Sequence, residues 1–103
     1  MSKAVYFVSY NLVKGASVPD FLLATEKLNN DYMSKQKGYI SWKQLREDDM
    51  WVDLLTFETM DDAIKVSNPS GTNDLAEKFY SFIDPENCKP HLFSVEKSYC
   101  LTK

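Results

Sequence analysis

The extended segments of this sequence are apolar at neighbouring positions, and this feature limits what the chain can fold into. Residues 5–10 read Val-Tyr-Phe-Val-Ser-Tyr, and residues 52–57 read Val-Asp-Leu-Leu-Thr-Phe. Because successive side chains of a strand point to opposite faces, a sheet built from these segments would be apolar on both faces. The helices of one chain can cover only one of them. The sequence therefore favours a sheet whose second face is covered by a second copy of the chain.

Length and composition predict one folded domain that spans residues 1–103. A chain of 103 residues is long enough for one modest core and too short for two. Its hydrophobic content of 44% and aromatic content of 14% lie far from those of disordered chains. The formal net charge is −3 and the basic residues are scattered, so no nucleic acid partner is expected.

The sequence contains neither a secretory leader nor an apolar run long enough to cross a bilayer. A cytoplasmic protein without a membrane partner is expected. The cysteines, Cys88 and Cys100, lack the spacing of a zinc site, and His91 is the single histidine, so no metal site is expected either. We expect two reduced thiols, with a regulatory disulfide as the alternative.

Strand and helix signals alternate along the first half of the chain. The β-branched and aromatic residues at 3–12 predict a strand. A helix is expected next, with Ser17 or Asp20 as its N-cap and Pro19 in its first turn. Gly38 is expected to close this helix. Residues 39–46 and 50–58 then read as two strands joined by a short acidic turn, which predicts an antiparallel hairpin.

The second half repeats the pattern of a helix followed by a strand. Thr59 and the acidic pair after it predict a helix start, and Asn68-Pro69-Ser70-Gly71 should interrupt that helix. A second short helix is expected over 73–83, and residues 91–99 alternate as a last strand. The order β-α-β-β-α-β predicts a ferredoxin-like α+β fold, with a four-stranded antiparallel sheet and the helices on one face.

Two stretches resemble a known family. Gly38-Tyr39-Ile40-Ser41 is similar to the glycine-aromatic start of the second strand in antibiotic-biosynthesis monooxygenases, and residues 55–63 resemble the strand-to-helix run of that family. The resemblance extends from Val5 to Tyr99. It implies a dimeric α+β barrel, in which the sheets of two subunits face each other and the helices lie outside. It also implies a ligand cavity within each subunit, between the sheet and its helices.

The resemblance implies a homodimer that binds a small apolar or aromatic molecule. The activity it suggests is that of a cofactor-independent monooxygenase acting on an aromatic or polyketide-like compound, or of a related isomerase. Haem chemistry is disfavoured, because Val66 and Ala76 stand near the places where haem-degrading members carry a tryptophan and the axial histidine. The alternatives are a non-enzymatic ligand-binding or stress-response barrel and a subunit-interaction module. No catalytic motif separates these functions.

Asp53 and His91 are the candidate catalytic residues. Asp53 lies within an apolar strand, where a carboxylate must find a partner or change its pKa. Lys43 or Gln44 across the hairpin would be a structural partner, whereas an Asp53 that faces the cavity would be a general base. His91 can act as an acid or base near neutral pH, or it can be a ring without a role.

Five further residues are candidates for ligand binding. Ser9 and Asn11 share a strand face, and Asn11 resembles an asparagine that haem-degrading members place near the ligand, although a turn role is the alternative. Trp42 and Trp51 could stack on a flat ligand or serve as core or dimer contacts. Tyr80 could supply a hydroxyl. A cavity of about 300 Å³ or more, with Asp53, Asn11 or His91 pointing into it, would favour ligand binding.

Overall fold

The computed structural model describes residues 2–67 and 73–101, and these residues form a four-stranded antiparallel sheet with helices on one face. The strand order is β2-β3-β1-β4. The elements in chain order are β1 (Ala4–Tyr10), α1 (Val18–Asp31), the 3-10 helix η1 (Met33–Lys35), β2 (Tyr39–Glu47), β3 (Met50–Phe57), α2 (Met60–Ser67), α3 (Asp74–Tyr80), the 3-10 helix η2 (Pro85–Asn87) and β4 (Lys89–Ser94).

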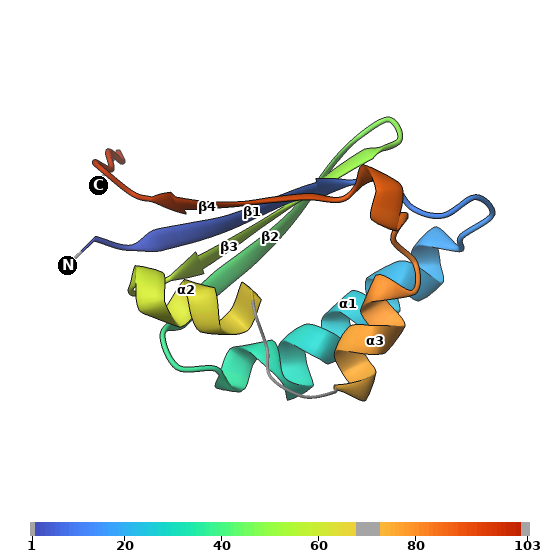
Figure 1. Ribbon diagram of the computed structural model, residues 1–103, viewed down its shortest axis with the longest axis horizontal. Helices are drawn as coiled ribbons and strands as arrows, with labels where there is room; N and C mark the ends of the chain where they lie inside the picture. The colour runs from blue at the N-terminus through green and yellow to red at the C-terminus, as the bar shows by residue number, and fades with distance from the viewer. Residues whose placement is uncertain (1, 68–72, 102–103) are drawn as a thin grey trace.

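The ferredoxin-like α+β fold predicted from the sequence is confirmed. In Figure 1 the sheet is seen on edge, and α1, α2 and α3 all lie below it. Two short helices, α2 and α3, follow the hairpin as predicted, while the predicted interruption at 68–71 lies outside the described residues. None of the helices in the described part of the chain has the length and apolar character needed to span a bilayer.

The core lies between the sheet and the helices, and aromatic rings form its centre. Phe21 of α1 is fully buried and packs edge to face against Tyr10 of β1 and Trp51 of β3. It also stacks on Phe79 of α3, with ring centroids 5.3 Å apart. One side chain thus connects α1 with the sheet and with α3, and such buried aromatic contacts dominate the stability of a small core.

Local capping explains where the helices begin. Ser17 Oγ accepts a hydrogen bond from the Asp20 backbone N–H, so Ser17 is the N-cap of α1 and Asp20, the other candidate, lies in the first turn with Pro19. Thr59 Oγ1 accepts from the Asp62 N–H at the start of α2 at 3.1 Å. Asn73 caps α3 by accepting from two backbone N–H groups.

The end of the first helix differs from the prediction. Helix α1 ends at Asp31, and η1 follows it, so Gly38 does not close the helix. Gly38 instead turns the chain into β2 with a φ of +81°, a conformation that glycine adopts readily. A Cβ atom at this position would also collide with the Asp62 carboxylate of α2. The glycine is required by a contact between distant segments, which a local helix-stop pattern does not show.

The last strand is shorter than predicted. It covers Lys89–Ser94 rather than residues 91–99. Ser94 pairs with Ala4, the first residue of β1, and the Val95 N–H donates to the Lys3 carbonyl at 2.8 Å. Beyond that point the neighbouring strand offers no further partner, so the alternating residues that follow remain outside the sheet. Tyr99 is accordingly 82% exposed.

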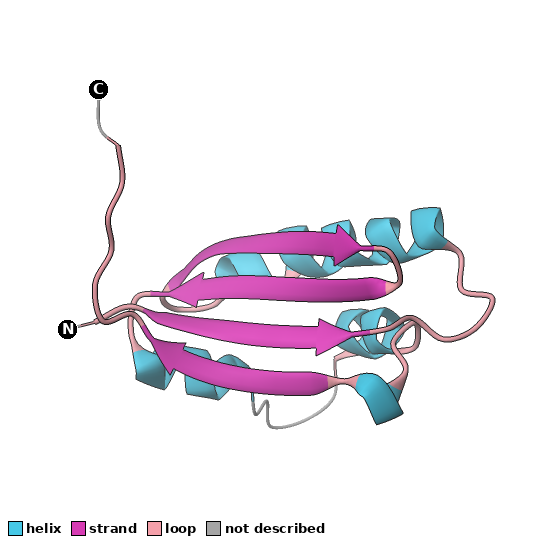
Figure 2. Cartoon of the chain, turned by 90° about the horizontal axis from the view of Figure 1, so that it is seen from above, coloured by secondary structure: helices cyan, strands magenta, loops and turns pink. Residues whose placement is uncertain are grey.

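The side of the sheet away from the helices is uncovered by the described helices, as Figure 2 shows. We call this side the open face. Strand alternation places on it Val5, Phe7, Ser9, Ser41, Lys43, Leu45, Val52, Leu54, Thr56, Lys89, His91 and Phe93. Phe93 is 53% exposed and Leu45 47% exposed. Apolar side chains therefore lie on both faces of the sheet, as the sequence predicted, although the open face also contains polar and charged residues.

Candidate functional site

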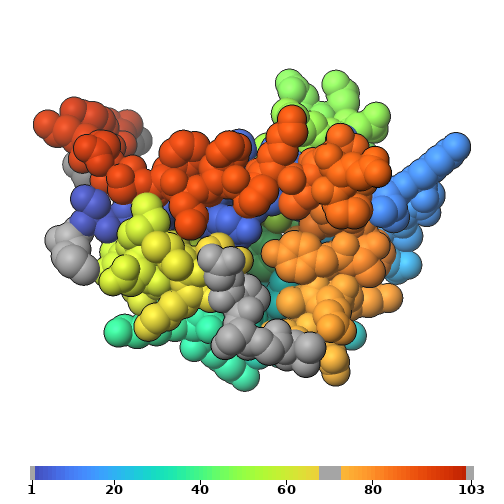
Figure 3. All heavy atoms as spheres, in the orientation of Figure 1, coloured from blue at the N-terminus to red at the C-terminus, as the bar shows by residue number. Residues whose placement is uncertain are grey.

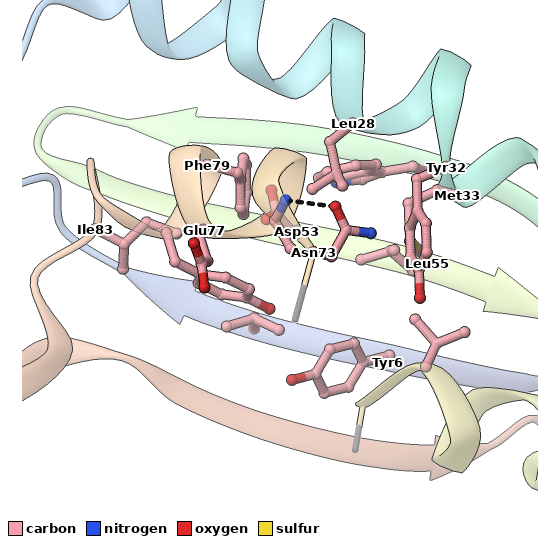
Figure 4. A pocket seen from close by; sticks show the side chains of 15 residues that line it. Tyr6, Leu28, Tyr32, Met33, Asp53, Leu55, Asn73, Glu77, Phe79 and Ile83 are labelled. Carbon is pink, nitrogen blue, oxygen red and sulfur yellow. Dashed lines mark hydrogen bonds between the residues drawn. The ribbon is translucent and has the colours of Figure 1, made fainter. Parts of the chain in front are cut away.

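A cavity of about 300 Å³ lies between the sheet and the helices. Its lining is mostly aromatic and aliphatic. The sheet contributes Tyr6, Val8, Trp42, Asp53 and Leu55, and the helical side contributes Leu28, Tyr32, Met33, Val66, Asn73, Ala76, Glu77, Phe79, Tyr80 and Ile83. Figure 4 shows these side chains converging from β1 and β3 on one side and from α1 and α3 on the other. This volume and character suit a small organic ligand.

The cavity exists because α2 and α3 cover different parts of the sheet. Helix α2 packs on β1, β3 and β4, whereas α3 packs mainly on α1. The two helices stand apart in Figure 1, and the space-filling view of Figure 3 shows them as two separate groups of atoms, yellow and orange. At the start of α3, Asn73 accepts a hydrogen bond from the Ala76 N–H at 3.2 Å, the dashed line in Figure 4.

Asp53 is the buried carboxyl group of the cavity wall. Strand alternation places it on the helix side of β3, and it is only 3% exposed. Burial raises its pKa from 3.8 to about 7, because desolvation disfavours the charged form, and hydrogen bonds from neighbouring polar groups lower it only in part. A carboxyl group with this pKa exists in both protonation states near neutral pH, which suits it to accept and return a proton.

A chain of hydrogen bonds fixes one oxygen of this carboxyl group. Tyr10 Oη donates to Asp53 Oδ1 at 3.0 Å. Gln44 Nε2 donates to Tyr10 Oη at 3.4 Å and to Thr25 Oγ1 at 3.1 Å, and Thr25 donates in turn to the Phe21 carbonyl at 3.0 Å. Because Gln44 donates to both hydroxyl oxygens, the Tyr10 proton is directed toward Asp53. Oδ1 is therefore held as an acceptor.

Trp42 brings a second polar group to the same wall. Its Nε1 atom is buried and has no hydrogen-bond partner among the described residues. The N–H lies near enough to Asp53 to contribute to the lowering of its pKa, but the two groups do not reach the geometry of a full hydrogen bond, so the donor has capacity left for a ligand. The indole ring is held edge to face against Phe79, with centroids 5.4 Å apart.

Tyr6 and Tyr80 add two hydroxyl groups to the polar part of the cavity, which also includes Tyr32, Asn73 and Glu77. Burial raises the pKa of Tyr6 above 10.0 and that of Tyr80 to about 12. Tyr80 is 51% exposed as a whole residue, so this shift reflects the desolvation of its hydroxyl end rather than of the entire side chain. Both hydroxyls stay protonated near neutral pH and can donate hydrogen bonds to a ligand.

The structure brings together three of the residues that the sequence singled out. Asp53, Trp42 and Tyr80 all line the cavity. Gln44 lies directly across the hairpin from Asp53, whereas Lys43 pairs with Leu54 and shares its side of the sheet, the open face. Of the two partners considered for Asp53 from the sequence, the amide is therefore the one on the same face.

The other candidates lie elsewhere. Ser9 and His91 are on the open face, and the His91 ring stacks on Phe93 with centroids 5.8 Å apart. His91 and Asp53 are thus separated by the sheet within one subunit. Asn11 Nδ2 donates to the Asp49 carbonyl at 2.7 Å, beside the hairpin turn. Trp51 packs in the core and under the Arg46 guanidinium, 5.0 Å from the ring centroid.

Tyr10 and Gln44 complete the hydrogen-bond chain, and sequence reasoning did not assign either of them to the site. The sequence does carry a partial signal for them. Tyr10 is two and four positions from Val8 and Tyr6 on one strand face, and Gln44 is two positions from Trp42 on another. In the folded sheet Asp53 pairs with Val8 of β1 on one side and with Gln44 of β2 on the other. This strand register, which brings Tyr10 and Gln44 close to Asp53, is not visible in the sequence.

No protein-family model matches the sequence. No curated protein matches it either. Solved structures do match over nearly the whole chain. SnoaB, a cofactor-independent oxygenase from Streptomyces nogalater, is 13% identical with a TM-score of 0.76, and the match covers 95% of this chain and 97% of SnoaB.

Two further structures show how widely this fold is used. A protein from Nitrosomonas europaea, provisionally described as an antibiotic biosynthesis monooxygenase, is 15% identical with a TM-score of 0.70, over 92% of this chain and 91% of its own. Hydroxynitrile lyase from Passiflora edulis is 12% identical with a TM-score of 0.65, over 96% and 98%. At such identities the likeness establishes the shared fold, and one fold serves different reactions.

Proposed function

We propose that this chain, which has the fold of antibiotic-biosynthesis monooxygenases, is a homodimeric cofactor-independent monooxygenase acting on a small aromatic or polyketide-like compound. The observation that carries the proposal is the Asp53 carboxyl group, with a pKa of about 7, in the wall of an apolar cavity of about 300 Å³. The fold shared with SnoaB, a cofactor-independent oxygenase, supports it. Asp53 is the general base in this proposal.

The chemistry requires a substrate that becomes electron-rich when it loses a proton. Asp53 removes a proton from an activated carbon beside a phenolic ring, and the resulting carbanion supplies electrons to O₂ and forms a carbon–oxygen bond. The peroxide anion formed takes up a proton and becomes a hydroperoxide. The hydroperoxide then loses the second hydrogen of the same carbon as a proton and breaks its O–O bond, and the hydroxide released takes up that proton. The products are a carbonyl group and one water, so one oxygen atom enters the substrate and the other is reduced to water.

The cavity provides the surroundings that this step needs. Apolar walls keep bulk water away from the carbanion, and they strengthen the electrostatic effect of the few polar groups that remain. The hydroxyls of Tyr6 and Tyr80 lie in the same lining and are protonated near neutral pH. They are suited to hold the oxygens of a polyphenolic ring.

The homodimer is the second part of the proposal, and its support is the open face. A monomer would leave this apolar surface in water, whereas a second copy would cover it with an identical surface. Apolar residues of the central strands β1 and β3 lie in the middle of that face, whereas Lys43, Lys89 and His91 lie on the edge strands β2 and β4, which matches an interface with an apolar core and a polar rim. A stable dimer of this kind buries about 800 Å² per subunit.

Asp53→Asn tests the proposed base. Oxygen consumption is measured with a panel of polyphenolic compounds that carry an activated methylene group, and the variant should be slower by at least about a hundredfold, the usual contribution of a general base. Asp31→Asn, which alters an exposed carboxylate at the end of α1, is the matched control and should leave the rate unchanged. Equal rates for wild type and Asp53→Asn would remove Asp53 from the reaction. Binding without oxygen consumption would favour the alternative, a non-enzymatic ligand-binding barrel.

A further inference from the structure

The unpaired indole N–H of Trp42 is the feature of the cavity that the proposed base does not explain. Buried polar groups in folded proteins are almost always hydrogen-bonded, because an unpaired donor in an apolar environment is unfavourable. The Trp42 Nε1 atom is buried without a partner among the described residues. Its ring packs edge to face against Phe79, and the nearest described acceptor, the Asp53 carboxyl group, is not within hydrogen-bond geometry. A ligand atom is the natural partner for such a donor.

Trp42 and Asp53 converge on the same part of the cavity. Trp42 pairs with Leu55 and Gln44 pairs with Asp53 across the hairpin, so the indole and the carboxyl group are diagonal neighbours on one face of the sheet. Both line the cavity. Since Tyr10 donates to Oδ1 of Asp53, the oxygen that exchanges a proton with a ligand is Oδ2. A donor and a proton acceptor are thus presented side by side.

The charges of the lining restrict the ligand further. Asp53 and Glu77 contribute carboxyl groups, and the described lining residues include no lysine, arginine or histidine. A permanently anionic group such as a carboxylate or phosphate would meet negative charge without a compensating cation. A simple hydrocarbon or ether would leave the indole donor or the carboxyl group unsatisfied. A ligand oxygen that can be neutral or anionic can accept a hydrogen bond from the indole N–H and can also share one proton with the carboxyl group.

We propose that Trp42 Nε1 donates a hydrogen bond to a phenolic or enolic oxygen of the ligand, and that the same oxygen shares a proton with Asp53 Oδ2. The site then selects phenols and enolisable carbonyl compounds. This inference deepens the proposed function and rests on its cavity, and it assigns to Trp42 the stabilisation of the negative charge that develops when the substrate is deprotonated. Binding alone tests it, without oxygen.

The experiment compares para-nitrophenol with para-nitrotoluene, in which a methyl group replaces the hydroxyl at nearly the same size. Affinities are measured by calorimetry at neutral pH for wild type, Trp42→Phe and the control Trp51→Phe. Trp51 lies outside the cavity lining, and phenylalanine at position 42 keeps an aromatic ring but removes the donor. Wild type and Trp51→Phe should bind the phenol at least about tenfold more tightly than the toluene, and Trp42→Phe should lose most of that preference, as expected for one hydrogen bond to a charged oxygen.

A second measurement uses unmodified protein, in case Trp42→Phe does not fold. In a sample labelled with ¹⁵N at tryptophan, the Trp42 indole N–H resonance, identified by the spectrum of Trp51→Phe, should move downfield on addition of para-nitrophenol and stay in place with para-nitrotoluene. Equal affinity of wild type for the two probes, no binding of either, or an unchanged indole resonance would each overturn the inference. An inactive enzyme that still shows the preference would refute the oxygenase proposal and leave this one standing.

Discussion

The protonation state of the Asp53 carboxyl group affects the stability of the fold. The Asp53 side chain is 3% exposed, and burial raises its pKa from 3.8 to about 7. In the unfolded chain the same group returns to an ordinary value. The folded state therefore binds more protons than the unfolded state between pH values of about 4 and 7, so this group makes the protein less stable as pH rises through that range.

The first prediction concerns this pH dependence. Asp53→Asn keeps a neutral group of similar size, so the difference in free energy of unfolding between variant and wild type should grow as pH rises from about 4. It should level off above about 7, at roughly 2 to 4 kcal/mol in favour of the variant. Urea unfolding at a series of pH values measures this difference, and Asp31→Asn should show none. A difference that does not vary with pH would mean that Asp53 has an ordinary pKa.

The sequence could identify Asp53 but not its surroundings. A carboxylate within an apolar strand is a local anomaly, visible in residues 52–57. Its link to Tyr10, Gln44 and Thr25 depends on strand register and on where α1 lies, and these are set by contacts between residues far apart in the chain. The position of Ser9 on the open face follows from the same register.

At the scale of elements, local signals predicted most of what the structure contains. The acidic turn, the Ser17 cap and the helix start at Thr59 each depend on neighbouring residues, and the structure has all three. The end of β4 and the role of Gly38 depend on partners elsewhere. Gly38 faces Asp62, a contact between the start of β2 and the first turn of α2.

Gly38→Ala and Gly15→Ala form a matched pair that tests this contact. Both glycines have positive φ values, +81° and +82°, but a Cβ at Gly15 meets nothing within 4 Å. Gly15→Ala should cost about 1 kcal/mol from backbone strain alone. Gly38→Ala should cost roughly 2 kcal/mol or more in addition, because Asp62 must move as well. Thermal unfolding measures the stability of the two variants. An equal loss of stability in both would show that the Asp62 side chain can move away from the new Cβ without an energetic cost.

At the scale of the whole molecule, the open face determines how the chain behaves in solution. Strands that are apolar on both sides were visible in the sequence, and the structure shows that its helices cover one side only. The TM-scores of 0.76 and 0.70 with other structures establish the fold. The number of subunits is a separate property, which sedimentation measures directly.

The proposed dimer is tested by Leu54→Lys. Leu54 lies on the open face in the central strand β3, so a lysine there, unlike Lys43 and Lys89 on the edge strands, would place two equivalent charges in the middle of the interface and should convert the dimer to monomer. Leu23→Lys, on an exposed position of α1 that is 51% accessible, is the control and should sediment like wild type. A wild-type chain that sediments as a monomer at high concentration would leave the open face without its proposed partner.

The cavity and the open face lie on opposite sides of one sheet, and this arrangement has a consequence for turnover. If two chains join through their open faces, the active site of each subunit is enclosed by helices of its own chain. The two active sites are then separated by the thickness of both sheets. Each active site would then work alone. A mixed pair with one inactivated member would run at half speed rather than stop, and substrate uptake would follow a simple hyperbola.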